Sequence, residues 1–448
     1  MYTLTEVVSK RDRKAFLMLP VRLYKDVKEW IRPLDQSIEN VFDPQKNAAF
    51  RDGVCIRWIL KNERKQVIGR VAAFIDYGSA NHNEQPTGGL GFFECENDQL
   101  AANMLFDACK NWLMSKGMQA MDGPVNFGER NSWWGLLVEG YEIEPTFEMY
   151  YHFPYYKQLF EAYGFQNYIN QYTYHRYIDT GGLAPVIYRK AERIFQDPSY
   201  TFEHIRKKNI DKYIEDFKAV YNQTWTGFTG NKTMTTEIVR GMFETMKPIM
   251  DERLIWFAYH NGRPVALFVN IPDLNQAVKH LNGKFGKWAQ LKLMYHLKIR
   301  RSVKKIIGVI FGVIPEYHGR GLEGGLVLKF AREAAYRKSC PYTEMELNWI
   351  GDFNPVMMKM VERIGGRMYK THVTYRFLFD RSKPLVRPAK VNMTLPGRTA
   401  GQPDAGTDQT PSDAAGTDKV PKTPADTAEP ARPTPPVETA ETTEEAAE

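Results

Sequence analysis

The sequence has few cysteines and no long apolar run. Its 448 residues include four cysteines, without a C-x-x-C pair or a metal-binding spacing, so neither a disulfide framework nor a metal site is expected. The longest apolar run, Ile306 to Pro315, is about half of the roughly 20 residues that span a bilayer. Met1 to Phe16 is polar and lacks the apolar core of a secretion signal. These absences argue against secreted and membrane-spanning classes and predict a cytoplasmic protein.

Aromatic residues are missing from Pro388 to Glu448, where Pro, Thr, Ala, Asp and Glu dominate. Such a segment cannot bury enough apolar surface to offset the entropy of ordering it, so we expect a disordered tail over 385–448. From Pro388 onward the chain carries five basic and eleven acidic residues, so the net charge of +7 conceals +13 on residues 1–387. That charge suggests an anionic partner: nucleic acid, a phosphorylated cofactor or a membrane surface. An ordinary basic protein fits it equally well.

Hydrophobic periodicity predicts an α/β chain whose second half repeats the element order of the first. We interpret this as a tandem duplication with domains at 1–180 and 200–384 and a boundary near Gly181 to Tyr200. In the first half we expect a helix around Tyr24 to Arg32, a hairpin (54–60 and 67–75), strands at 88–95, 120–125 and 169–177, and helices at 100–112 and 155–163. In the second half we expect helices at 210–221, 236–249, 322–336 and 355–364, a hairpin (255–260 and 264–271), and strands at 306–314, 343–350 and 371–379.

A glycine-rich turn follows the strand at 306–314. The run is Val313-Ile314-Pro315-Glu316-Tyr317-His318-Gly319-Arg320-Gly321-Leu322-Glu323-Gly324-Gly325. Glycines let backbone N–H groups converge on one point, and the helix that follows adds a partial positive charge, so the run predicts a phosphate or pyrophosphate cradle. Packing needs alone can also place glycines before a helix, and that alternative stays open. The run fits neither a nucleotide P-loop nor a dinucleotide fingerprint.

The order of strand, glycine turn, helix, strand 344–350 and Asn354 with a helix ending in glycine resembles the core of the Gcn5-related N-acyltransferase (GNAT) superfamily. The resemblance implies an α/β fold of two tandem GNAT-like domains, with mixed, mostly antiparallel sheets flanked by helices. It also implies acyl-CoA as the donor substrate and no permanently bound cofactor. Of the family's turn pattern only Gly321 matches strictly, and Glu323 would repel a pyrophosphate. The residues implied to form the coenzyme A cradle are Val313, Ile314, His318, Gly319, Arg320, Gly321, Leu322 and Gly324.

The superfamily often places a proton-donating tyrosine seven residues after its asparagine, where this sequence has Val361. Catalysis is therefore expected to rest on amide donors at the end of the strand, at Val313 and Ile314, stabilising the thioester oxyanion. Candidate catalytic side chains are Glu346 and Asn348, which alternate on one side of their strand and are expected to face a cleft there, and Tyr317 at the mouth of that cleft. Each of them also suits a solvated or structural polar residue.

The first half lacks the cradle. Glu94-Cys95-Glu96-Asn97-Asp98 stands where the turn should be, and this acidic run would repel phosphate, so this half is not expected to bind coenzyme A. The run Gly123 to Gly135, with two adjacent tryptophans, predicts a pocket wall or an interface loop. A buried loop with aromatic packing is an equally good interpretation.

A set of short motifs occurs over most of residues 1–380. They are Lys14 to Pro20, Phe42 to Asn47, Gly91 to Glu94, Gly123-Pro124, Pro154 to Tyr156, Asn222 with Trp225, Pro272 to Asn275 and Glu346 to Ile350. Together they resemble a bacterial family of two-domain acyltransferases that includes the bacterial ceramide synthases. The resemblance implies transfer of a fatty acyl group, from acyl-CoA or an acyl carrier protein, to the amine of a sphingoid long-chain base. Two alternatives stay open: an aminoacyl or small-molecule N-acetyltransferase, and a non-catalytic acyl-thioester or nucleic-acid-binding regulator.

No acidic residue occurs between Asp273 and Glu316, where nine Lys and Arg residues interleave with apolar ones that include Trp288. A basic amphipathic stretch with a tryptophan predicts contact with an anionic membrane surface, and so a peripheral location on the inner membrane. A solvated helix with a core-facing stripe is the alternative. Nucleic acid is disfavoured as a partner, since no base-reading motif accompanies the charge.

Overall fold

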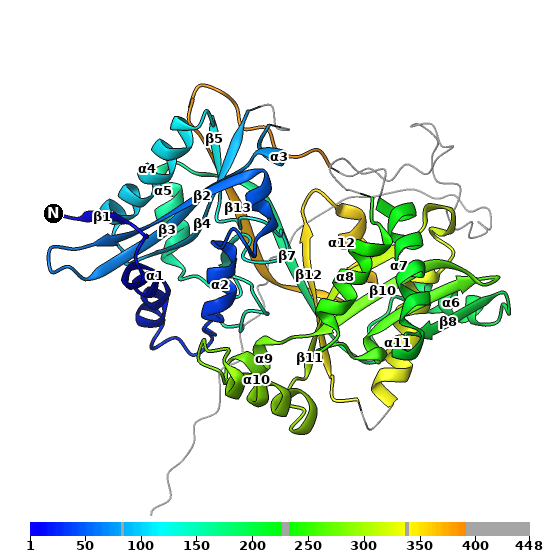
Figure 1. Ribbon diagram of the computed structural model, residues 1–448. Helices are drawn as coiled ribbons and strands as arrows, with labels where there is room; N and C mark the ends of the chain where they lie inside the picture. The colour runs from blue at the N-terminus through cyan, green and yellow to red at the C-terminus, as the bar shows by residue number, and fades with distance from the viewer. Residues whose placement is uncertain (82–84, 226–232, 337–339, 391–448) are drawn as a thin grey trace, which may run out of the picture. The chain divides into compact units, whose positions relative to one another are not determined.

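The computed structural model describes residues 1–81, 85–225, 233–336 and 340–390. One compact unit spans Met1–Leu395. Its strands form a single mixed sheet, with helices packed against it (Figure 1). Most of the expected tail, from residue 391 onward, lies outside the described residues.

The first half follows the predicted order of hairpin, strand, helix, strand, helix and strand. The expected hairpin is confirmed as β2 and β3, with Arg57 opposite Ala72. The elements are β1 (Thr3–Glu6), α1 (Lys10–Leu23), α2 (Asp35–Val41), β2 (Gly53–Lys61), β3 (Val67–Asp76), α3 (Tyr77–Ala80), β4 (Thr87–Cys95), α4 (Gln99–Ser115), β5 (Ala120–Gly123), β6 (Leu136–Glu139), α5 (Tyr155–Tyr163) and β7 (Gln166–Tyr177).

The second half repeats that order and adds helices between its strands. Its hairpin is β9 and β10, as expected from the Asn261-Gly262 turn. The elements are α6 (Pro185–Phe195), β8 (Tyr200–His204), α7 (Ile210–Trp225), α8 (Thr236–Met246), β9 (Ile255–His260), β10 (Arg263–Pro272), α9 (Asn275–Val278), α10 (Lys287–Met294), a π-helix (Tyr295–Ile299), β11 (Lys305–Val313), α11 (Leu322–Tyr336), β12 (Glu344–Gly351), α12 (Pro355–Arg363) and β13 (Arg367–Leu378).

Each half gives its last strand to the sheet of the other half. The strand order is β1-β2-β3-β4-β5-β13-β7-β12-β11-β10-β9-β8, with β6 on β13. Thus β13 pairs with β5 of the first half, whereas β7 pairs with β12 of the second. The two exchanged strands also pair with each other, from Arg367 to Arg376 of β13 (Figure 1). Neither half has a complete sheet without the other, and the limits 1–180 and 200–384 for separate domains stay a prediction.

Two large hydrophobic cores lie on the shared sheet. The first-half core includes Phe93, Leu105, Phe106 and Phe160, from β4, α4 and α5. The second-half core includes Phe257 and Leu326, from β9 and α11, together with buried residues of α7 and α8. Apolar residues at helical spacing on α4, α5, α7 and α8 supply these cores, which is why the periodicity of those helices was readable.

The expected helix around Tyr24 to Arg32 is wrong, because the helix lies earlier, in α1. A capping box starts α1: the Ser9 side chain accepts from the Asp12 N–H, while the Asp12 side chain reaches back to the Ser9 N–H. The helix continues through Pro20 and ends at Tyr24, whose ring stacks on Trp30 and Phe153.

The stretch expected to be the boundary between the halves contains helix α6. Its buried residues, Ala191 and Ile194, are spaced for one helical face. This face packs on α11, directly behind the glycine-rich turn. The helix therefore belongs to the site described next.

Candidate active site

Strands β11 and β12 pair in parallel and then separate. Their register covers only Lys305–Gly308 opposite Glu344–Leu347. Beyond it β11 continues along β10 to Val313, while the end of β12 pairs with β7 at Ile350 and Gly351. The separation leaves an opening between the two strands that begins at Val309 and Asn348. Backbone groups on the open side of a separated strand can hydrogen-bond an extended ligand.

A β-bulge lies at the start of this opening. Asn270 of β10 opposes Gly308 and Val269 opposes Ile310, so Val309 has no partner in β10. The Val309 side chain is 40% exposed, in a strand that is otherwise largely buried. A bulge turns backbone groups away from the ladder, which makes the Val309 amide a candidate for donating to a ligand. The Ile314 amide, expected to be an oxyanion donor, instead donates to the Val265 carbonyl at 3.0 Å.

The glycine-rich turn is held by side chains that point back into the protein. Tyr317 is buried, and its hydroxyl forms a 2.8 Å hydrogen bond with Nδ1 of His260. His318 Nε2 donates to the Val313 carbonyl at 2.8 Å. Gly319 and Gly321 have φ of +74° and +103°, which is why glycine is needed at both. The turn therefore places Gly319 and Arg320 outward, ahead of α11.

Two glycines of the run also allow α6 to approach. A Cβ at Gly321 would lie 2.8–3.0 Å from Lys190 atoms, and one at Gly324 would lie 2.5 Å from Ile187. Lys190 Nζ donates to the Gly319 carbonyl at 2.9 Å, which fixes α6 on the turn. Packing is thus part of the reason for these glycines, alongside any role as a cradle.

Gly321→Ala should destabilise the protein more than Gly319→Ala. Both residues have positive φ, which costs a non-glycine residue about 1 kcal/mol. Only Gly321 is also crowded, whereas a Cβ at Gly319 meets nothing within 4 Å. We expect a loss of about 2–3 kcal/mol at Gly321 and about 1 kcal/mol at Gly319, measured by urea unfolding. Equal losses would show that α6 yields easily and that the close approach is unimportant.

A basic groove of about 500 Å³ adjoins the turn. Lys190 and Arg193 come from α6, Arg320 from the turn, and Asp197 is the one carboxylate among its lining residues. All three basic side chains are exposed. The groove therefore offers an excess of positive charge beside the N-terminus of α11, which suits a phosphate-bearing ligand and offsets the charge of Glu323.

Asn348 lies on β12 where the opening begins. Its Nδ2 donates to Thr146 Oγ1 at 2.9 Å, across to a loop of the first half. Its Oδ1 is buried and has no hydrogen-bond partner among the described residues. A buried acceptor left unpaired is costly, which makes this oxygen a candidate to bind a donor from a ligand.

Glu346 is fully buried between two lysines. Its carboxylate pairs with Lys305 Nζ at 2.5 Å and with Lys370 Nζ at 2.8 Å. Burial alone would raise the pKa of Glu346, but the charges of Lys370 and Lys305 outweigh it and hold the pKa below its usual range. Burial and the Glu346 charge raise the pKa of nearby Asp273 to about 7. An ionised, doubly paired carboxylate with a lowered pKa is a weak base, so these contacts favour a structural role.

The corresponding opening in the first half is closed by its own chain. Strands β4 and β5 also pair only briefly, over Thr87–Gly89, and β4 also bulges, with Phe92 at φ +52°. Here the Phe92 N–H donates to the Tyr150 hydroxyl at 2.7 Å, and the Val125 N–H donates to the Leu90 carbonyl at 2.8 Å. The Phe92 amide at this bulge is therefore already used.

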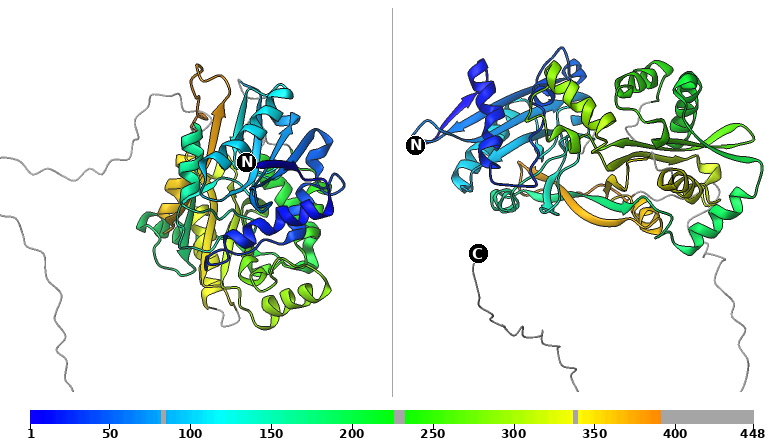
Figure 2. Two further views of the ribbon diagram at one scale, coloured as in Figure 1. Left: turned by 90° about the vertical axis from the view of Figure 1, so that its left-hand side faces the viewer. Right: turned by 90° about the horizontal axis from the view of Figure 1, so that it is seen from below.

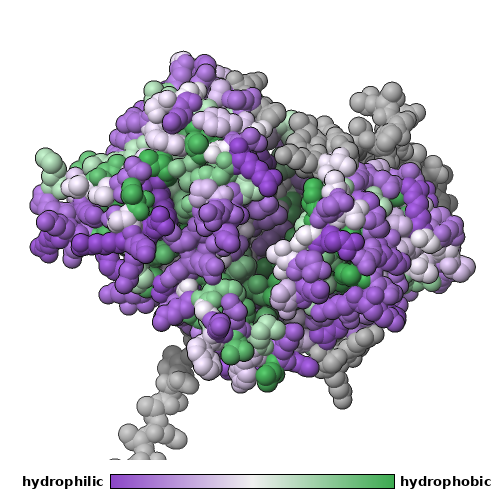
Figure 3. Space-filling model, viewed as in Figure 1, coloured by the Kyte–Doolittle hydropathy of each residue, from purple (hydrophilic) through white to green (hydrophobic). Residues whose placement is uncertain are grey.

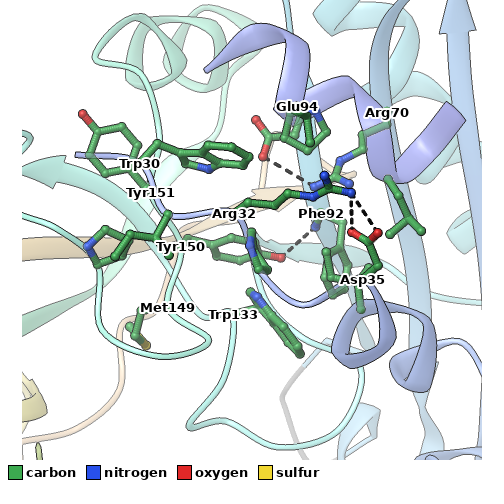
Figure 4. Close-up of a pocket in the computed structure, with 17 residues that line it drawn as sticks. Trp30, Arg32, Asp35, Arg70, Phe92, Glu94, Trp133, Met149, Tyr150 and Tyr151 are labelled. Carbon is green, nitrogen blue, oxygen red and sulfur yellow. Dashed lines mark hydrogen bonds and ion pairs between the residues drawn. The ribbon is translucent and has the colours of Figure 1, made fainter. Parts of the chain in front are cut away.

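Side chains also fill the first-half pocket (Figure 4). Its cavity is about 30 Å³, which is room for about one water. The ion pairs Arg32–Asp35 and Arg70–Glu94 cross it, at 2.8 and 3.5 Å. Glu94 also accepts from the hydroxyls of Tyr24 and Tyr156, each at 2.8 Å.

The acidic run expected to repel phosphate has structural partners. Asp98 caps α4 by accepting from the Ala101 N–H, and it also accepts from the Tyr2 hydroxyl. A carboxylate thus occupies the helix end where the second half has its glycine turn.

The predicted site residues therefore fall into separate groups. The turn residues lie together with Tyr317 beside the groove, whereas Glu346 and Asn348 lie where β11 and β12 part. In the Gly123 to Gly135 loop, Trp133 is buried among aromatic rings. Trp134 Nε1 donates to Thr374 of β13 at 3.1 Å. Sequence reasoning missed α6 and the bulge at Val309. The helical spacing of Ile187, Ala191 and Ile194 could have revealed the first.

Two strand pairs that run parallel and then separate, in one shared sheet, define the tandem GNAT fold. A solved tandem GNAT protein from the clavulanic acid biosynthesis pathway is similar in structure, with a TM-score of 0.50 and 12% identity. The match covers 86% of this chain and 100% of that one. The fold expected from the glycine-rich run is confirmed.

In sequence, the chain is similar to a protein named bacterial ceramide synthase from Caulobacter vibrioides. The two are 26% identical over 374 residues, which cover 82% of this chain and 95% of the relative. Protein YghO of Escherichia coli is also 26% identical over 374 residues, with 93% of its length covered. No model of a known protein family matches the sequence. The predicted resemblance to ceramide synthases is thus confirmed as a similarity.

Proposed function

We propose that the protein is an N-acyltransferase that moves a fatty acyl group from acyl-CoA to the amine of a lipid such as a sphingoid long-chain base. The observation that carries the proposal is the contrast between the halves. The second half keeps an opening at β11 and β12 beside a basic groove, whereas the first half closes its own. The similarity to the relative named bacterial ceramide synthase supports the choice of acceptor.

In this proposal the donor lies along the second half. Lys190, Arg193 and Arg320 hold the phosphates of coenzyme A at the N-terminus of α11. The extended arm of the donor enters the opening and pairs with the free side of β11. The thioester carbonyl then reaches the bulge at Val309, where the Val309 N–H stabilises the oxyanion.

The acceptor amine attacks the thioester carbonyl, so that a C–N bond forms and the C–S bond breaks. The nitrogen loses a proton and the departing thiolate gains one. The unpaired Oδ1 of Asn348 accepts from the amine and orients its lone pair. Their contacts give Tyr317 and Glu346 positioning roles: Tyr317 holds the turn through His260, and Glu346 holds the strands that form the opening.

A lipid acceptor also requires access to a membrane. No helix in the described part of the chain is long and apolar enough to cross a bilayer. We therefore propose that the protein meets its acceptor from the surface of an anionic membrane, as a peripheral protein.

The proposal is tested by incubating the purified protein with sphinganine and palmitoyl-CoA, or palmitoyl carrier protein, and searching for the amide by mass spectrometry. Asn348→Leu should lower kcat by about 10²-fold, because the amine loses its acceptor. Asn97→Leu, at an exposed site in the first half, is the matched control and should leave the rate unchanged. If the amide forms only with small polar amines, the acceptor is a small polar amine and not a lipid. No amide with any amine, together with tight DNA binding, would overturn the enzymatic proposal.

A further inference from the structure

Helix α10 and the π-helix that continues it expose a row of large apolar side chains. Trp288 is 86% exposed, Leu291 62%, Tyr295 48% and Ile299 73%. Spacings of three, four and four residues place them along one side of the helical segment. Green side chains stand out on the lower edge of the molecule, over α9 and α10 (Figure 3). Single exposed apolar residues are ordinary, but an aligned row of four marks an interaction surface.

The opposite side of the same segment is anchored in the protein. Leu293 is buried, with Ala289 and Leu297 packed beside it, in a small core shared with Leu34 and Phe147 of the first half. The turn just before the segment is also held against the first half, since the Asp35 N–H donates to the Gly283 carbonyl at 2.9 Å. The helical segment is therefore apolar on two sides. Packing in the small core accounts for the buried side and does not account for the exposed row.

The surroundings of the exposed row are basic. The stretch from Leu274 to Pro315 contains no acidic residue. Lys287 and Lys298 are exposed on this segment, and Lys284 and Arg300 are exposed just outside its two ends. Lys279, outside the row, pairs with Glu144 of the first half at 3.0 Å. Seen from below, the segment faces the viewer (Figure 2, right).

We propose that this face, defined by Trp288, Leu291, Tyr295 and Ile299 with its basic rim, docks the protein on an anionic phospholipid bilayer. The apolar row enters the boundary between headgroups and acyl chains, where tryptophan and tyrosine are favoured, and the lysines meet the lipid phosphates. A second copy of the chain fits this face less well, because two equally basic rims would repel each other. This docking face rests on the proposed function, because a lipid acceptor is what requires the protein to reach a membrane.

The full chain should float with vesicles of phosphatidylglycerol and phosphatidylcholine in a density gradient, and bind phosphatidylcholine vesicles at least tenfold more weakly. Trp288→Ser/Leu291→Ser/Ile299→Ser should weaken binding to the anionic vesicles by at least tenfold. Lys284→Gln/Lys287→Gln/Lys298→Gln should weaken it and flatten its salt dependence. Brominated acyl chains should quench the tryptophan fluorescence of the wild type more than that of Trp288→Phe, which locates Trp288 in the bilayer.

Leu100→Ser/Met114→Ser removes exposed apolar residues from α4 and should bind like the wild type. Equal binding by the wild type and the triple serine variant, or equal loss in the α4 control, would overturn the assignment. So would a wild-type dimer that the serine variant dissociates, or DNA binding without vesicle binding. Vesicle binding is scored without any acyl transfer. An inactive protein that floats would therefore refute the proposed function alone, and an active one that does not float would refute the docking face alone.

Discussion

Replacing Glu346 by leucine should lower the free energy of unfolding by about 3–5 kcal/mol, because the change leaves two buried lysines without their counter-ion. Lys305 of β11 and Lys370 of β13 both pair with this carboxylate, and their side chains are 8% and 3% exposed. The cluster therefore joins three strands, including the exchanged β13 and the two strands that form the opening. Urea unfolding followed by circular dichroism measures the loss.

A neighbouring glutamate on the same strand gives the matched control. Glu344 pairs with His175 at 2.9 Å, but its side chain is 28% exposed, so Glu344→Leu should cost only about 0–1 kcal/mol. Adding Lys305→Met and Lys370→Met to the Glu346→Leu variant should restore most of the stability, since an apolar cluster of similar volume replaces the charges. If Glu346→Leu costs no more than Glu344→Leu, the buried cluster does not stabilise the exchanged strands.

The hairpins and helix α11 could be predicted because each is specified by residues close together in the sequence. The hairpins β2–β3 and β9–β10 follow from alternating apolar residues around polar turns. Helix α11 follows from the glycine turn and the apolar stripe behind it. Helix α1 was missed because Pro20 lies within it, although its Ser9–Asp12 capping box is visible in the sequence.

The exchange of β7 and β13 could not be predicted from one sequence. Both strands have the composition of a strand that completes its own sheet, and only the pairing of residues such as Tyr172 and Thr371, which are far apart in the chain, shows where they lie. The packing of the whole unit decides which of two possible strands a given strand pairs with. The hydrophobic periodicity of one strand carries no information about that choice.

The site could be predicted only where its residues are consecutive in the sequence. The glycine turn was readable because its residues are consecutive. The groove was not, because Lys190 and Arg193 come from a helix more than a hundred residues before Arg320. The side of β12 that holds Glu346 was predicted to face a cleft, but the lysines that bury it come from β11 and β13.

The double variant Arg193→Gln/Arg320→Gln should lower kcat/KM for palmitoyl-CoA by about 10²-fold, mainly through KM. Both guanidinium groups line the groove beside α11, and a hydrogen bond to a charged group is worth about 1.5 kcal/mol or more, or about tenfold each. The same variant should leave kcat/KM unchanged for palmitoyl N-acetylcysteamine thioester, which carries the reacting carbonyl but no phosphate. Steady-state kinetics with both donors measures the difference.

Arg189→Gln/Arg363→Gln removes the same charge from exposed positions that do not line the groove, and it should lower neither value. A loss shared equally by the two donors would mean that the groove supports the fold or the reacting atoms and does not bind the nucleotide. No loss with either donor would place the phosphates elsewhere and would remove the reason for the positive charge around Gly319. A loss confined to palmitoyl-CoA would assign the groove to the phosphates, and it would explain how Glu323 is tolerated beside them, because the arginines and Lys190 outweigh its charge.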